Sequence, residues 1–370
     1  MDLIATFVYM NTANRSNKLV ATWLLVGVVM TIIQFVLGGV TRLTGSGLSI
    51  TEWDVITGAL PPLSEQAWLA EFAKYKQTPQ FQLLNFEFDL QNFKYIFFWE
   101  WFHRLWARII GVVFAVGFIW FLIAKHFKKE MIKPLVVLFF LGAMQGAIGW
   151  IMVASGLEGD AVYVKPTRLA LHFIFALGLL CYTFWFALQL LLPDMSVKVV
   201  PAYAQRIKKA ASSNLLILAL LVVQLLYGAL MAGHKAAVVA PTWPSINGDF
   251  VPSSLFSDTQ FFLNFIENKL LVHFMHRGIA YLLFVLITLW SIQLFKIKGT
   301  SSVFNAVKML PLLLVVLQIL LGIASLLYAR TIIPGTWGVF EWMAQIHQLV
   351  GMSLLLSLVA TYYVIRAQTK

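Results

Sequence analysis

Four histidines recur at matching places in this 370-residue chain, each inside a long apolar segment: His103, His172, His276 and His347. An ionisable residue in such a segment is costly to bury and is commonly functional. Two imidazoles that face each other across a helix bundle are typical of bis-histidine haem ligation. We therefore predict that the four histidines bind haem iron as two pairs, one pair in each half of the chain.

Two alternatives to haem ligation stay open at this point. A single histidine of this kind is more often a hydrogen-bonded core residue, and the fourfold recurrence is what favours ligation. A zinc site would recruit a third ligand such as Cys, Asp or another His. Glu100 and His273 are the residues that keep such a metal site under consideration.

An arginine follows the first histidine of each pair. Arg104 comes after His103, and Arg277 comes after His276. Haem carries two propionates, and a guanidinium binds carboxylates in a bidentate manner. We predict propionate contacts for both arginines, with interfacial anchoring by snorkelling as the alternative.

The two halves differ three residues before that histidine, where Glu100 occupies one half and His273 the other. Residues at i and i+3 share a helix face, so Glu100 is expected beside His103. A carboxylate in a partly dry pocket can accept a proton or stabilise a developing cation. We predict that Glu100 is catalytic; its alternative role is to orient a ring or pair with Arg104. His273 is expected in the pocket but not as an iron ligand.

The elements that position these residues are membrane helices. The chain is 60% hydrophobic and 12% charged, with a mean hydropathy of +0.81, a balance that excludes a soluble domain. Apolar runs long enough for a bilayer core of ~30 Å predict an all-α integral membrane protein with eight transmembrane helices. The expected spans are 18–40, 98–124, 134–154, 168–192, 213–233, 271–295, 309–328 and 342–365.

The spans form an internal repeat. Each odd-numbered span carries a Gln-x3-Gly motif, at Gln34, Gln145, Gln224 and Gln318. His103 and His276 are 173 residues apart, as are Gln145 and Gln318. This predicts two tandem, parallel-oriented four-helix bundles, residues 1–195 and 196–370, related by pseudo-twofold symmetry. The alternative for each motif is small-residue packing with a polar contact between helices.

Charge sets the expected topology. The net charge is +11, and alternate loops with both termini hold 15 Lys/Arg against 3 Asp/Glu. The positive-inside rule then places both termini in the cytoplasm and all four histidines toward the outer face. The basic residues thus reflect topology and indicate no nucleic-acid partner. The long outer loop 41–96 suits the covering of a substrate, so we expect the reaction in the N-terminal half.

Several motifs make the sequence resemble the haem A synthase family of the mitochondrial and proteobacterial type. They are GGVTRLTGSGLSITEWDVITGALPP, EWFHRLWAR, RLALHF, HFMHRGIAY and MAQIHQLVG, in that order. The resemblance implies oxidation of a methyl group of haem O to a formyl group, in successive two-electron steps that make haem A for terminal oxidases. It also implies haem b on His276 and His347, haem O on His103 and His172, and an essential glutamate at Glu100.

The resemblance implies further expectations. Another type of the family carries a cysteine pair in the first outer loop, and loop 41–96 has none. Expected partners are haem O synthase, an electron acceptor or donor that the sequence does not identify, and the bilayer; a homo-oligomer is left open. The start of the chain favours the inner membrane of a bacterium.

The alternative function is a dihaem cytochrome that transfers electrons or oxidises quinone without porphyrin chemistry. His126 is expected at the surface. His234, just past the fifth span, is expected to be a structural residue, with a place near the haem pocket as the alternative.

Overall fold

The computed structural model describes residues 2–53, 57–192, 201–256, 261–298, 302–333 and 335–366, and it contains helices and no strand in these ranges. Parts of the predicted loops, residues 54–56, 193–200, 299–301 and 367–370, lie outside the described residues. Eight of the described helices are long and apolar enough to cross a membrane, as predicted. They are α1 (Asp2–Leu43), α4 (Leu90–Ile123), α5 (Lys129–Ala154), α6 (Pro166–Leu191), α7 (Ala204–Gly233), α9 (Lys269–Phe295), α11 (Leu310–Tyr328) and α12 (Val339–Arg366).

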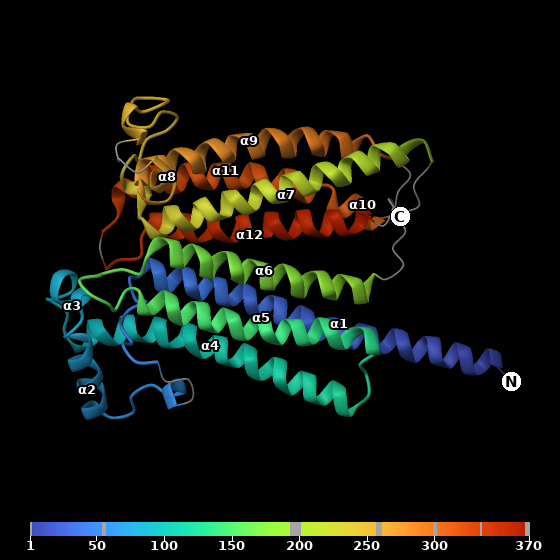
Figure 1. Ribbon diagram of the computed structural model, residues 1–370, viewed down its shortest axis with the longest axis horizontal. Coiled ribbons are helices and arrows are strands. Elements are labelled where there is room, and N and C mark those ends of the chain that lie inside the picture. Colours follow the sequence, from blue (N-terminus) through green and yellow to red (C-terminus); the bar gives the residue numbers. More distant parts are fainter. Residues whose placement is uncertain are drawn as a thin grey trace.

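The long helices run side by side in two groups (Figure 1). In the N-terminal half, α1 packs against α4 and α6, and α5 packs against α6. In the C-terminal half, α7, α9, α11 and α12 form a ring of neighbours. The groups meet where α6 packs against α7 and α12, and where α1 packs against α12. This arrangement is compatible with two tandem bundles, whose division at residues 195 and 196 and whose pseudo-twofold axis stay predictions.

The main hydrophobic core lies where the two groups meet. It includes Phe35 of α1, Leu180 of α6, Ile217 of α7, Trp290 of α9 and Leu358 of α12. Large side chains on the opposite faces of α4 and α5 are exposed instead. A helix satisfies its backbone hydrogen bonds within itself, so such apolar faces suit a hydrocarbon environment.

The first outer loop folds into a compact outer cap made of α2 (Glu65–Tyr75), α3 (Pro79–Leu84) and the beginning of α4. The side chains of Ser64 and Thr78 accept hydrogen bonds from the first turns of α2 and α3, as N-caps do. Phe93 is fully buried and stacks on Phe72 and Tyr75 at ring-centre distances of 5.0 and 5.3 Å. Burial raises the pKa of Tyr75 to about 12, so its phenol stays neutral at ordinary pH.

The start of α4 corrects one sequence prediction. The helix begins at Leu90, not near residue 98, because its first turns leave the apolar span and form a wall of the outer cap. Asp89 caps this start by accepting a hydrogen bond from the backbone N–H of Asn92 at 2.9 Å. The cap is therefore joined rigidly to the helix that carries Glu100 and His103.

The outer loop between α7 and α9 is built from shorter elements. It contains η3 (Ala236–Val238), η4 (Ser253–Phe256) and α8 (Phe261–Glu267). This loop and the outer cap lie at one end of the molecule, and the N and C ends of the chain lie at the other (Figure 1). The four histidines lie in the outer-loop halves of α4, α6, α9 and α12.

Candidate functional site

The histidine pair of the C-terminal half has the spacing of two axial ligands. The ring centres of His276 and His347 are 6.4 Å apart, and the ring planes are inclined at 76°. Two metal–imidazole bonds of ~2 Å, with ~1 Å more from each nitrogen to its ring centre, span roughly 6 Å. One iron ion between the two rings therefore matches the observed separation.

The histidine pair of the N-terminal half comes from two different helices. His103 lies on α4 and His172 on α6. Each is held by the glutamine of the preceding long helix: the Nε2 atom of Gln34 lies 3.1 Å from Nε2 of His103, and that of Gln145 lies 3.1 Å from Nδ1 of His172. The glutamines also donate to the backbone carbonyls of these histidines at 3.2 Å.

Glu100 is buried, and each of its contacts is with a hydrogen-bond donor. Its Oε2 atom accepts from the backbone N–H and the hydroxyl of Ser49, both at 2.7 Å, and from the backbone N–H of Ile50 at 2.9 Å. Its Oε1 atom accepts from Nη2 of Arg104 at 2.6 Å. The carboxylate thus links the first outer loop to α4, one turn from His103. Its ion pair with Arg104 is the contact expected if Glu100 has a structural role.

Both arginines clamp an outer loop. Arg104 donates to the carbonyls of Ile50 and Glu52, each at 3.1 Å. Arg277 donates to the carbonyls of Thr242, Pro244 and Ser245 at 2.8 to 3.2 Å. These contacts show how each guanidinium is held in place, and the propionate contacts stay a prediction for both.

His273 occupies the place that Glu100 holds in the other half. It is buried on α9, and its Nε2 atom lies 3.2 Å from Nη2 of Arg277. Its Nδ1 atom is buried and has no hydrogen-bond partner among the described residues. The residue at this position therefore contacts an arginine in both halves. The contact is made by a carboxylate, Glu100, in the N-terminal half and by an imidazole nitrogen, of His273, in the C-terminal half.

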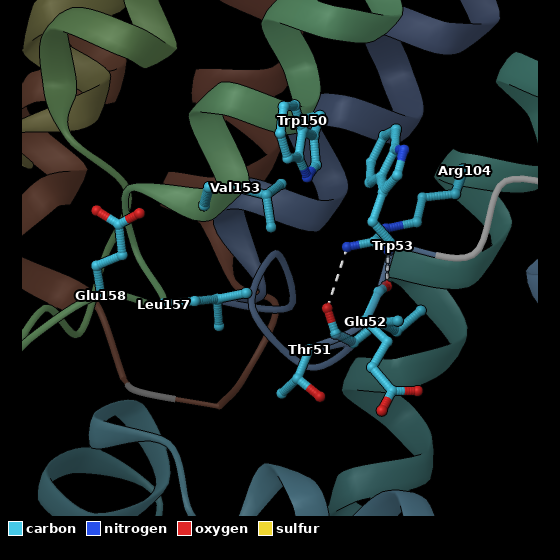
Figure 2. A pocket seen from close by; sticks show the side chains of 10 residues that line it. Thr51, Glu52, Trp53, Arg104, Trp150, Val153, Leu157 and Glu158 are labelled. Atoms are coloured by element: carbon cyan, nitrogen blue, oxygen red, sulfur yellow. Dashed lines mark hydrogen bonds between the residues drawn. The ribbon is translucent and has the colours of Figure 1, made fainter.

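A cavity of about 240 Å³ opens beside Arg104, the residue that follows His103. It lies between the first outer loop and the outer ends of α4 and α5, and its walls include Thr51, Trp53, Arg104, Trp150 and Glu158. Figure 2 shows Arg104 beside the indole of Trp53, with its guanidinium 5.3 Å from the ring centre. The wall combines the aromatic faces of Trp53 and Trp150 with one cation, Arg104, and two carboxylates, Glu52 and Glu158.

The remaining histidines lie apart from these sites. His126 contacts the hydroxyl of Ser16 at 2.9 Å, at the end of the molecule opposite the outer loops. His234 lies just past α7, where its Nε2 atom bonds to the carbonyl of Ile266 at 2.7 Å and lies 3.9 Å from Glu267. It holds α8 in place. In the described ranges, no three His, Cys, Asp or Glu side chains converge as a metal site would require.

Sequence reasoning missed Ser49 and the backbone N–H of Ile50, which complete the environment of Glu100. Ser49 lies in the GSGLSITEW stretch, but any residue offers a backbone N–H. No signal in residue type could therefore have identified these donors, because they depend on how the loop folds back onto α4.

Comparison with known proteins identifies relatives of the whole chain. The profile of the family described as cytochrome oxidase assembly protein matches residues 21–359. A haem A synthase of Flavobacterium johnsoniae is 38% identical over 94% of this chain and 98% of its own length. Haem A synthases of Methylobacterium radiotolerans and Rhodospirillum centenum are 41% and 43% identical, over 92% and 84% of this chain and 89% and 81% of their own lengths. The chain therefore belongs to the cytochrome oxidase assembly protein family that includes these haem A synthases.

Proposed function

We propose that this protein is a haem A synthase, a multi-pass membrane enzyme that oxidises haem O to haem A. The observation that carries the proposal is the pair of facing histidines, His276 and His347, in a chain related over most of its length to proteins of that name. The dihaem electron-carrier alternative is not favoured, because the relatives carry the name of the synthase.

The C-terminal half would hold haem b as a resident cofactor. His276 and His347 would hold its iron, which the separation of 6.4 Å between their rings supports. Bound there, haem b would supply one-electron redox chemistry. The protein's part is to fix both imidazoles and to keep the site within a ring of helices, α7, α9, α11 and α12.

The N-terminal half would hold the substrate, with the iron of haem O on His103 and His172. The cavity near Trp53 and Arg104 would receive an edge of the porphyrin. One methyl group would then be oxidised in two two-electron steps. In the first, the methyl carbon takes the oxygen of a water molecule and becomes an alcohol; in the second, it takes the oxygen of another and becomes a hydrated aldehyde, which loses water to leave the formyl group. Each step releases two protons and two electrons, and the electrons pass to an external acceptor. This is an oxidation at a C–H group.

Glu100 is the proposed catalytic residue of this half. Its carboxylate is held by four donor contacts at a fixed place next to His103. From there it can stabilise positive charge that develops at the methyl carbon, or take up a proton released there. The second half has no carboxylate at the equivalent place, where His273 stands, so this role is assigned to the first half alone.

We further propose that the outer loops face the periplasm, that both termini are cytoplasmic and that haem O synthase supplies the substrate. The surplus of basic residues in the loops opposite the outer cap supports this orientation in a bacterial inner membrane.

The test is expression together with haem O synthase in a host that makes no haem A, followed by extraction and chromatography of the bound haems. We expect haem b together with haem O or its oxidised products. Haem b alone, with haem O supply verified in the same membranes, would contradict the assignment and favour an electron carrier.

A further inference from the structure

The glycine of each Gln-x3-Gly motif lies against a histidine edge. A Cβ atom added to Gly38, Gly149, Gly228 or Gly322 would lie 2.9 to 3.3 Å from the Cε1 atom of His103, His172, His276 or His347, respectively. Such distances are tighter than ordinary van der Waals contact. Each of the four histidine rings therefore occupies space that a glycine leaves open on the preceding long helix.

Contact with a histidine ring is not a general property of glycines in these helices. Gly27, Gly111, Gly146 and Gly278 would each meet nothing within 4 Å, and the tightly packed Gly39 of α1 meets a glutamine, not a histidine. Small-residue packing between helices would not by itself place a histidine edge at every motif glycine. The coincidence of motif and ring in all four instances indicates a specific role.

The geometry also distinguishes the two ring nitrogens. At all four glycines the nearest ring nitrogen is Nδ1, at 3.3 to 3.8 Å from the added Cβ. In the last motif, Nδ1 of His347 lies 3.1 Å from the backbone carbonyl oxygen of Gln318, four residues before Gly322. The Nδ1 edge thus faces the preceding helix.

The glutamine side chain contributes a second contact. Its Nε2 atom lies 3.1 to 3.3 Å from the nearest ring nitrogen of the histidine in all four instances. Its Oε1 atom is buried without a hydrogen-bond partner among the described residues in all four. Turning the amide over would place an acceptor beside the ring, where Nδ1–H could donate to it. In the last motif the backbone carbonyl of Gln318 is a second acceptor for Nδ1–H of His347.

We propose that each Gln-x3-Gly motif is a histidine cradle, in which glycine makes room for the ring and glutamine accepts the Nδ1–H hydrogen bond. The bond fixes the tautomer and orientation that leave Nε2 free for iron, as partners of metal-bound histidine commonly do. The four cradles are Gln34 with Gly38, Gln145 with Gly149, Gln224 with Gly228, and Gln318 with Gly322. This inference rests on the proposed haem sites and assigns positioning roles to eight residues outside them.

The test uses the purified full-length protein and the absorbance spectrum of its haem b. In Gly228→Ala and Gly322→Ala, we expect loss of the six-coordinate, low-spin bands, because the added methyl displaces the ring. Gly38→Ala and Gly149→Ala place the same methyl in the other half, so they should keep the haem b spectrum and retain less haem O. Gly146→Ala, one turn from Gly149 but in open space, should change neither.

Folding of each variant is checked by gel filtration in detergent. If an alanine variant fails to fold, Gln224→Leu and Gln318→Leu test the same cradles without added bulk, because both remove the side-chain acceptor of an imidazole and should raise the haem b midpoint potential. The larger rise is expected in Gln224→Leu, since the backbone carbonyl of Gln318 stays beside Nδ1 of His347 in Gln318→Leu. Unchanged bands and an unchanged potential in the folded variants of the C-terminal half would overturn the cradle while leaving the proposed function intact. A wild-type protein without six-coordinate haem b would overturn both.

Discussion

Replacement of Glu100 by glutamine tests whether this carboxylate anchors the outer loop, acts in catalysis, or does both. The glutamine keeps the shape of the side chain, and its oxygen can still accept from Ser49 and Ile50. Its NH₂ group must then face Nη2 of Arg104, where the carboxylate oxygen accepts at 2.6 Å. Breaking a buried ion pair costs about 3–5 kcal/mol, and both partners here are largely buried.

The expected consequence is a local loosening of the loop that Glu100 holds. At the lower end of that range, about 3 kcal/mol corresponds to a change of roughly 100-fold in an opening equilibrium. Hydrogen–deuterium exchange at residues 49 and 50 should therefore accelerate by that factor in Glu100→Gln. Exchange in the cores of α7 and α12 should stay as in the wild type.

Ser49→Ala is the matched control, because it removes one donor and leaves the charge of Glu100 in place. A hydrogen bond to a charged group contributes about 1.5–3 kcal/mol, so exchange at residue 50 should accelerate roughly 10-fold or somewhat more. We expect haem O turnover to fall modestly in Ser49→Ala and to stop in Glu100→Gln.

Two results would refute this reasoning. Unchanged exchange at residues 49 and 50 in Glu100→Gln would show that the carboxylate does not hold the loop. Equal loss of turnover in Ser49→Ala and Glu100→Gln would show that the loop, not the negative charge, is what the reaction needs, and Glu100 would then be a positioning residue.

Three further substitutions address the other parts of the molecule. His276→Ala should abolish haem b binding while the helices persist, which the haem content and circular dichroism of the purified protein will show. Phe93→Ala removes a fully buried ring and should cost the outer cap about 3–5 kcal/mol; limited proteolysis should then cut residues 57–92, and protection of that segment would contradict the packing. Gly39→Ala would press a methyl onto the side-chain amide of Gln345 and should loosen α1 from α12; the open position Gly27 supplies the control, since Gly27→Ala should leave thermal stability equal or higher.

The sequence predicted the long helices and the place of the four histidines toward the outer ends of those helices. Both features leave a signal in residue type. An apolar run reveals a span whatever its neighbours are, and a histidine inside it is conspicuous. The predicted start of α4 was late because its first turns carry charged and polar residues, which hydropathy alone assigns to a loop. The outer cap was expected only as a cover, although the N-caps Ser64 and Thr78 lie in the sequence before α2 and α3.

The contacts between helices left no comparable signal. The spacing of Gln34 and Gly38 shows that both lie on one face of a helix, but it does not show which ring that face meets. The same pattern therefore predicted small-residue packing equally well, and only the three-dimensional arrangement joins each motif to His103, His172, His276 or His347. The donors to Glu100 were beyond prediction for a similar reason, because two of them are backbone N–H groups.

The difference between Glu100 and His273 also changes the charge around two equivalent arginines. Glu100 pairs with Arg104 and neutralises it, whereas no carboxylate among the described residues pairs with Arg277. Under the proposed function, an anionic porphyrin would meet a compensated cation in the N-terminal half and an uncompensated one in the C-terminal half. Binding that is equally strong for substrate and transition state does not accelerate a reaction, and a product must leave. The difference between Glu100 and His273 thus suits the N-terminal half to the binding and release of a substrate. It suits the C-terminal half to a cofactor that stays bound.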